Sequence, residues 1–226
     1  MRYELRDVGD GRCEFLAFDV DPRFDATMEA LAWQRSGGAW GRQIACEAAV
    51  AEPALANLRT FMSPLLRQAA GLEPVPWQDA LDELCSRFEA GGVGWFLGGS
   101  AALAVRGAPL TPHDLDLITD DADAIRVGDL LADVILEPVA TAEWPLSIWW
   151  GRAFLYARVE WAGGMTAAAD QPQVTDFGPV AASQLETVRW RGWQLRVPPL
   201  HLQRAVCDRR GLTARVAMID ELNARR

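Results

Sequence analysis

The sequence predicts a mixed α/β fold, in which a β-sheet is flanked by helices and preceded by an N-terminal hairpin-plus-helix appendage. Two observations predict this fold. Short apolar strands alternate with amphipathic helices after residue 76, which is typical of a sheet covered by helices. The chain has 226 residues, of which 50% are hydrophobic and 23% charged, so it is long and apolar enough to bury one large core.

The first half of the expected appendage is a hairpin followed by a short helix. Gly9-Asp10-Gly11 separates two strand-like runs, Tyr3 to Val8 and Cys13 to Val20, and therefore predicts a turn. Phe24 to Trp33 has helical spacing, which Ser36-Gly37-Gly38 then interrupts.

A longer helix and a boundary follow. The helix is expected to begin at Pro53, because apolar residues recur at helical intervals: Leu55, Leu58, Phe61, Met62 and Leu65. Gly71 and Pro74-Val75-Pro76 favour a loop after it. We therefore expect one unit over residues 1–76 and a second over residues 77–226.

Helices and strands alternate at the start of the second unit. The expected helices are Trp77 to Glu89, Ala101 to Arg106 and Asp120 to Leu131. The expected strands between and after them are Val93 to Leu97, Asp114 to Ile118 and Val134 to Glu137.

The rest of the chain predicts more strands and two final helices. Arg152 to Trp161 is expected to form one long strand because of its aromatic and β-branched content. Thr187 to Trp190 and Trp193 to Val197 predict a hairpin. One helix is expected from Pro198-Pro199 to Arg209, and another from Thr213 to Ala224, separated by Gly211.

The composition excludes some classes of chemistry. All 22 basic residues are arginine, so a P-loop and Schiff-base catalysis, which both need lysine, are excluded. The four cysteines form no CxxC pair and there are two histidines, which argues against zinc. The longest uncharged run, residues 90–105, is too short and glycine-rich to span a membrane. We expect a cytoplasmic protein with reduced thiols and no membrane partner.

Two aspartates form a candidate metal site. Asp114 and Asp116 lie two residues apart in an expected strand, so both side chains point to the same face, and Leu115 and Leu117 point into the core. Paired carboxylates repel unless a cation lies between them. Because no lysine is available and the ligands are oxygens, the pattern favours Mg²⁺.

A glycine-rich turn precedes the aspartates. Gly98-Gly99-Ser100 connects an expected strand to an expected helix, where backbone N–H groups are free to bind phosphate and the Ser100 hydroxyl adds a donor. Arg106, on the helix that follows, either reaches a phosphate or is a solvated surface residue. A phosphate-binding turn beside paired metal carboxylates is what nucleotidyl transfer requires.

These residues resemble a known superfamily. A Gly-Ser turn followed by Asp-hydrophobic-Asp-hydrophobic is typical of the DNA polymerase β-like nucleotidyltransferases, and thirteen residues separate Ser100 from Asp114 here. The sequence around the motif is similar to that of the lincosamide and aminoglycoside nucleotidyltransferases, and to that of the abortive-infection nucleotidyltransferase toxins. The close resemblance covers residues 77–137 at its widest.

The resemblance implies a nucleotidyltransferase fold and a third carboxylate. Glu160 is the best candidate for this metal ligand or general base, although relatives carry aspartate there; Asp170 and Asp176 are the fallbacks. The implied reaction is Mg²⁺-dependent, with two ions, and moves a nucleoside monophosphate from ATP or another NTP to a hydroxyl of a small molecule. Gly98, Gly99 and Ser100 would bind the triphosphate.

Two other functions stay open at the sequence level. The last 38 residues contain nine arginines and three acids, so a toxin-like transferase acting on tRNA is an alternative. A catalytically inactive nucleotide-binding or interaction module is another, and it predicts that Glu160 lies exposed or far from the aspartates. Tryptophans such as Trp144 and Trp150 either fill the core or a homo-oligomer contact or line the acceptor pocket.

Overall fold

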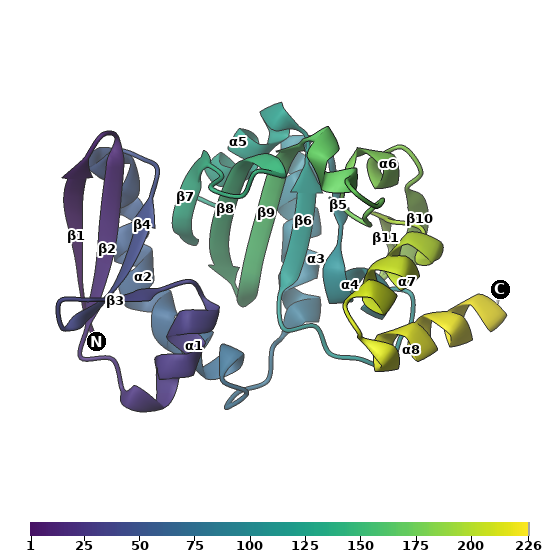
Figure 1. Cartoon of the computed structure of the whole chain (residues 1–226), viewed down its shortest axis with the longest axis horizontal. Coiled ribbons are helices and arrows are strands. Elements are labelled where there is room, and N and C mark those ends of the chain that lie inside the picture. Colours follow the sequence, from purple (N-terminus) through teal and green to yellow (C-terminus); the bar gives the residue numbers. More distant parts are fainter. Residues whose placement is uncertain (226) are drawn as a thin grey trace.

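The computed structural model describes residues 1–225, which form a four-stranded sheet, a five-stranded sheet and a two-stranded ribbon (Figure 1). The N-terminal sheet and the C-terminal helices lie on opposite sides of the five-stranded sheet. This arrangement confirms the predicted mixed α/β fold.

The N-terminal sheet is antiparallel, with strand order β1-β2-β4-β3. Its strands are β1 (Arg2–Gly9), β2 (Arg12–Phe18), β3 (Gln34–Ser36) and β4 (Ala39–Ile44). The β1–β2 hairpin confirms the expected turn at Gly9-Asp10-Gly11. Helical spacing near Phe24 gives only η1 (Pro22–Phe24) and α1 (Asp25–Ala30). Gly37 and Gly38, with positive φ angles of 53° and 87°, form the turn of a second hairpin, β3–β4.

Helix α2 (Ala48–Ala69) joins the two sheets. It packs against β1 on one side and against β7 of the five-stranded sheet on the other. Its Asn57 amide donates hydrogen bonds to the carbonyls of Ala132 and Ile135, each 3.0 Å long. The helix begins five residues before the expected Pro53, because the alanine-rich residues 48–51 favour a helix, which then continues through Pro53 and Pro64.

The five-stranded sheet has the order β5-β6-β9-β8-β7. Its strands are β5 (Trp95–Leu97), β6 (Leu115–Thr119), β7 (Ile135–Thr141), β8 (Ser147–Leu155) and β9 (Ala157–Met165). Strands β6 and β9 are parallel, and the other neighbours are antiparallel. The single strand expected from Arg152 to Trp161 is wrong: Tyr156, with φ of 59°, turns the chain there, so these residues belong to the β8–β9 hairpin.

One face of this sheet is covered by helices α3 (Trp77–Gly91) and α5 (Asp121–Leu130). Trp161 of β9 is fully buried on that face, where its indole N–H donates to the carbonyl of Ala124 in α5. Side chains alternate along a strand, so Glu160 points to the opposite face. The open face of the sheet therefore carries the candidate site.

The C-terminal region lies beside β5 (Figure 1). It comprises η2 (Ala167–Asp170), α6 (Pro179–Ala182), the β10–β11 ribbon (Glu186–Trp190 and Trp193–Val197), α7 (Leu200–Arg209) and α8 (Thr213–Ala224). Leu103 of α4 (Gly99–Ala104) packs with Leu200, Cys207 and Ile219 in a small second core. This packing places the end of α7 and the start of α8 beside the Gly98-Gly99 turn.

The main core runs across residue 76 without interruption, since buried residues on both sides of it belong to one cluster, including Phe15, Leu66 and Trp161. The division at residue 76 therefore stays a prediction. Within residues 1–225, no helix is both long and apolar enough to cross a membrane.

Candidate active site

Four charged residues lie in one row across the open face of the sheet. Asp116 of β6 is in register with Glu160 of β9, Glu160 with Arg152 of β8, and Arg152 with Glu137 of β7. Neighbouring strands are about 4.8 Å apart, so the row spans roughly 14 Å of backbone. The parallel pairing of β6 with β9 is what brings a carboxylate from residue 160 beside one from residue 116.

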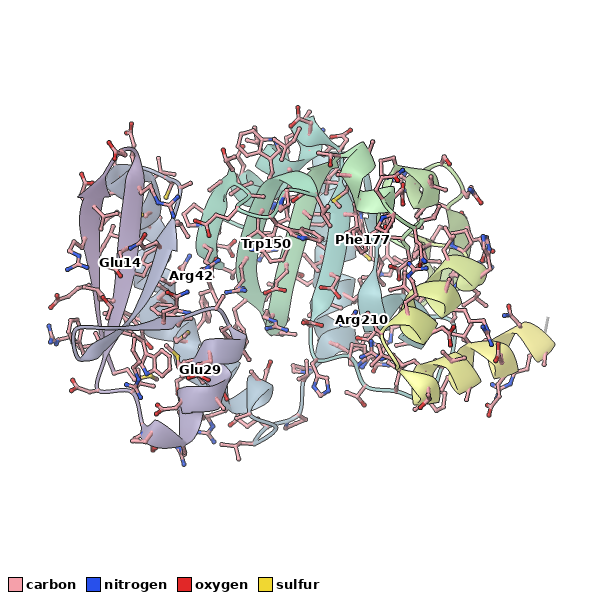
Figure 2. All side chains as sticks on the ribbon, viewed as in Figure 1. Glu14, Glu29, Arg42, Trp150, Phe177 and Arg210 are labelled. Atoms are coloured by element: carbon pink, nitrogen blue, oxygen red, sulfur yellow. The ribbon has the colours of Figure 1, made fainter. Side chains whose placement is uncertain are left out.

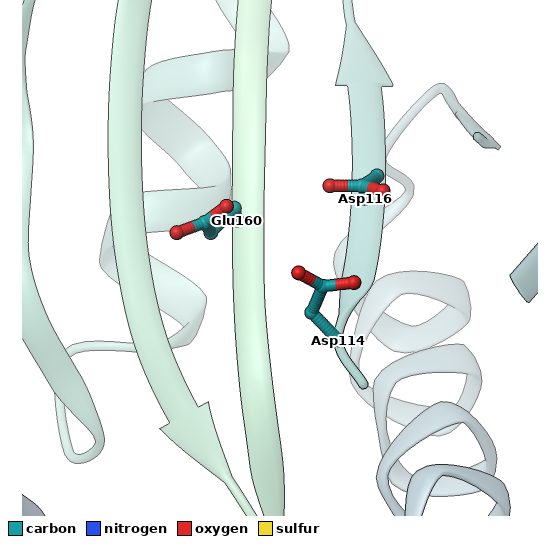
Figure 3. A group of neighbouring side chains, drawn as sticks. All are labelled: Asp114, Asp116 and Glu160. Carbon is teal, nitrogen blue, oxygen red and sulfur yellow. The ribbon is translucent and has the colours of Figure 1, made fainter. Parts of the chain in front are cut away.

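Asp114, Asp116 and Glu160 converge in this row (Figure 3). Each offers one carboxylate oxygen, and these oxygens all lie within 4.8 Å of one another. Asp114 immediately precedes β6, and its side chain points toward the same space as the other two. Three convergent oxygen donors suit a hard divalent cation such as Mg²⁺, so the donor set fits the metal that the sequence suggests.

Two arginines neutralise part of this negative charge. Arg158 forms an ion pair with Asp114, and the Nε of Arg152 donates to Glu160 Oε1 at 2.7 Å. Burial and the charges of Asp114 and Glu160 raise the pKa of Asp116 to about 7. Burial also acts to raise the pKa of Glu160, but the charges of Arg152 and Arg158 outweigh it and lower that pKa below its usual value.

The glycine turn approaches the carboxylates closely. The N–H of Gly98 donates to the carbonyl of Asp116 at 2.8 Å. Gly99 has φ of +56°, and a Cβ at this position would lie 2.0 Å from Asp116 Oδ2. Glycine is therefore required here both by backbone conformation and by space. Ser100 follows in α4, but it is buried and is not one of the residues that line the cavity described next.

A cavity of about 420 Å³ opens above these residues. Gly98, Gly99, Asp116 and Glu160 form one wall. Other walls are aromatic and basic; they are formed by Trp144, Trp150, Phe177, Arg210 and Arg215. Figure 2 shows Trp150 in front of the five-stranded sheet and Arg210 by the C-terminal helices. The cavity thus combines convergent carboxylates with guanidinium groups and flat apolar surfaces, a combination that suits a nucleotide with its metal.

Three other candidate residues have different surroundings. The side chain of Arg106 is buried and bonded to the ribbon and the residue after it: it donates to the carbonyl of Pro198 at 2.9 Å and pairs with Glu186 at 2.8 Å. These contacts connect the end of α4 to the C-terminal region, and Arg106 is not among the residues that line the cavity. Asp170 accepts hydrogen bonds from the N–H groups of Thr175 and Val180, so it orders a loop. Asp176 lines the cavity.

Sequence reasoning missed the arginines of the site. Arg158 and Glu160 are two residues apart, a spacing that puts both on one face of a strand. This spacing could have predicted Arg158 as a neighbour of Glu160. Arg152 was hidden because the hairpin at Tyr156 was not expected. Arg210 and Arg215 lie in the helical C-terminus, and nothing in their local pattern indicates which cavity they reach.

Neither a family model nor a curated protein matches the chain. Among solved structures, one similar chain comes from Thermotoga maritima and is provisionally described as a nucleotidyltransferase. It is 19% identical, with a TM-score of 0.49, and the match covers 66% of this chain and 94% of that chain. A likeness at this level does not assign an activity.

Proposed function

We propose that this protein is a Mg²⁺-dependent nucleotidyltransferase that moves a nucleoside monophosphate from an NTP, with ATP as the first candidate, to a hydroxyl of a small molecule. The observation that carries the proposal is the convergence of Asp114, Asp116 and Glu160 beside the tight Gly98-Gly99 turn. These are the residues that the resemblance implies, and they come from three separate stretches of the chain.

The chain's own residues would bind and orient the reactants. Asp114, Asp116 and Glu160 would hold the metal, which stabilises negative charge on the phosphates when bound. Arg210 and Arg215 would pair with phosphate oxygens from the side of the C-terminal helices. The hydrogen bond from Arg152 holds Glu160 Oε1 in place, which favours a ligand role for this residue over that of a mobile base.

The proposed reaction forms one bond and breaks one. The acceptor hydroxyl oxygen attacks the α-phosphorus, and the bond between that phosphorus and the oxygen bridging to the β-phosphorus breaks. Pyrophosphate leaves with the electron pair, and the hydroxyl proton passes to water. The in-line arrangement requires the acceptor to lie beside the carboxylates, opposite the leaving pyrophosphate.

The positions of two groups favour this function over the alternatives. An inactive module predicts Glu160 exposed or distant, whereas its side chain is 12% exposed and its carboxylate lies within 4.8 Å of both aspartates. A transferase acting on tRNA would use the basic C-terminus as its RNA contact, whereas Arg210 and Arg215 of that region line the cavity beside the carboxylates. Both observations support binding of a nucleotide in the cavity.

Calorimetry tests the proposal directly. We expect at least one of ATP, CTP, GTP and UTP to bind the full chain in the presence of Mg²⁺, and this binding to weaken at least a hundredfold in the double variant Asp114→Asn/Asp116→Asn. Asp10→Asn, in the exposed β1–β2 turn, is the matched control and keeps normal binding. Absence of Mg²⁺-dependent nucleotide binding in the unsubstituted chain would overturn the proposed function.

A further inference from the structure

A second cavity lies between the N-terminal sheet and the five-stranded sheet. Its volume is about 410 Å³, and it is lined by β4 and the residues just after it on one side, and by β7, the β7–β8 loop and β8 on the other. Figure 2 labels Arg42 and Trp150, which belong to its two sides. The nucleotide-binding motif does not account for this cavity, and the N-terminal segment supplies part of its wall.

The lining of this cleft is largely apolar. Its side chains include Ile44, Pro138, Ala140, Trp144 and Trp150. The buried charges at its floor are already neutralised, because Glu137 pairs with Arg42 at 2.9 Å and also with Arg152. Glu143 at the rim pairs with Arg12 at 2.5 Å. The cleft therefore offers flat apolar surface without an uncompensated charge for a cation to bind.

The cleft continues directly into the candidate active site. Trp144 and Trp150 line both cavities. In the strand register, Ala140 of the cleft is opposite Trp150, and Trp150 is opposite Ala162 of the nucleotide cavity. One strand spacing of about 4.8 Å separates each from the next. A molecule in the cleft that extends over Trp150 therefore enters the nucleotide cavity, which Glu160 also lines.

We propose that this cleft is the acceptor site, and that the acceptor is an uncharged aromatic or otherwise flat apolar compound that carries a hydroxyl group. The inference rests on the proposed function, since it places the hydroxyl next to the metal-binding carboxylates. A cationic acceptor is not favoured, because the acids of the cleft are paired with arginines. It also gives the N-terminal sheet a role, as one wall of the acceptor site.

The test uses 2-naphthol, a planar aromatic alcohol, as the probe. Its binding to the full chain is measured by calorimetry for the unsubstituted protein and for Ala140→Trp and Ala142→Trp, which fill the cleft from β7 and from the adjoining loop. Ala56→Trp, on the exposed side of α2 and outside both cavities, is the matched control. Circular dichroism verifies that each variant is folded, and the second cleft variant serves if the first does not fold.

We expect 2-naphthol to bind the unsubstituted protein and the Ala56→Trp control, and to bind each folded cleft variant at least tenfold more weakly. We also expect its affinity to change less than threefold when the protein is saturated with Mg²⁺ and ATP, because donor and acceptor occupy different cavities. Equal binding by the cleft variants, displacement by ATP, or no binding to the unsubstituted protein would each overturn the acceptor assignment. Failure of the proposed function is read separately, from the titration with Mg²⁺ and ATP alone.

Discussion

Gly99 is the residue whose identity is most tightly constrained at the site. Its φ of +56° is unfavourable for other residues, and an added Cβ would lie 2.0 Å from Asp116 Oδ2. We expect Gly99→Ala to lower the free energy of unfolding by about 1–3 kcal/mol and to weaken Mg²⁺-dependent nucleotide binding at least tenfold, because Asp116 must move. Chemical denaturation and calorimetry measure the two effects.

Gly71→Ala is the matched control for this substitution. Gly71 also has a positive φ, +70°, but a Cβ there meets no atom within 4 Å. Gly71→Ala therefore has the unfavourable backbone conformation but no steric clash of the added Cβ, and we expect this variant to bind nucleotide normally. If Gly99→Ala binds nucleotide as Gly71→Ala does, the turn does not position Asp116.

Asp176 makes the stability of the protein depend on pH. Burial is the main reason that its pKa rises from 3.8 to about 6, with Arg209 and Arg210 opposing the rise. Because the folded-state pKa is the higher one, its favourable contribution is complete below pH 3.8 and is lost as the pH rises through about 6. We expect Asp176→Asn to be more stable than the unsubstituted protein by about 1–2 kcal/mol at pH 8.

The comparison is made by urea denaturation at pH 8 and at pH 5. The stabilisation should shrink at the lower pH, where the carboxyl group of Asp176 is mostly protonated. Asp10→Asn, in the exposed β1–β2 turn, is the control for the loss of a negative charge. An equal gain at both pH values would show that the buried charge is not its cause.

Among the elements, those with a local signal were predicted well. The β1–β2 hairpin, the β10–β11 hairpin and helix α8 depend on turn glycines and on helical spacing within a short stretch, and their positions agree with the structure. The β8–β9 hairpin was missed because Tyr156 turns the chain with φ of 59°. A positive φ is uncommon for a bulky residue, so a tyrosine in the sequence does not predict a turn. Such a turn is stabilised by the strands that it joins.

The candidate site also has some residues that a local sequence signal predicts and others that it does not. The Gly98-Gly99 turn and the aspartates were recognisable because their spacing is local and matches a known motif. Glu160 was proposed from its position, and the parallel pairing of β6 with β9 explains why it lies beside Asp116. The cleft depends on Arg42 and Glu137, which are 95 residues apart. No local pattern predicts a contact of that range, because it results from how α2 holds the two sheets together.

At the scale of the whole molecule, charge is organised as a chain across the open face of the sheet. Arg42 of the N-terminal sheet pairs with Glu137, Glu137 with Arg152, and Arg152 with Glu160. Arginine is well suited to the position that joins these two carboxylates. Arg152 uses its planar guanidinium to bond to two carboxylates from different strands at once, which a lysine ammonium does with less geometric control. The N-terminal sheet is thereby linked electrostatically to the carboxylate cluster of the candidate site.

The same organisation predicts how the whole protein responds to metal. Asp114, Asp116 and Glu160 repel one another, and Arg152 and Arg158 offset only part of that repulsion. Mg²⁺ that binds the folded chain alone stabilises it by about 2.7 kcal/mol at a concentration of 100 times Kd. For a chain of 226 residues, that corresponds to an increase in Tm of about 5–10 °C.

The substituted site should respond to metal differently. We expect the Tm of Asp114→Asn/Asp116→Asn to show little increase with Mg²⁺, because two of the three carboxylates that converge at the site are removed. Thermal denaturation with MgCl₂, and with NaCl at equal ionic strength, separates specific binding from screening of the net charge of −9. If both proteins gain equally from MgCl₂, the metal acts on the general negative surface, and the three carboxylates are not its site.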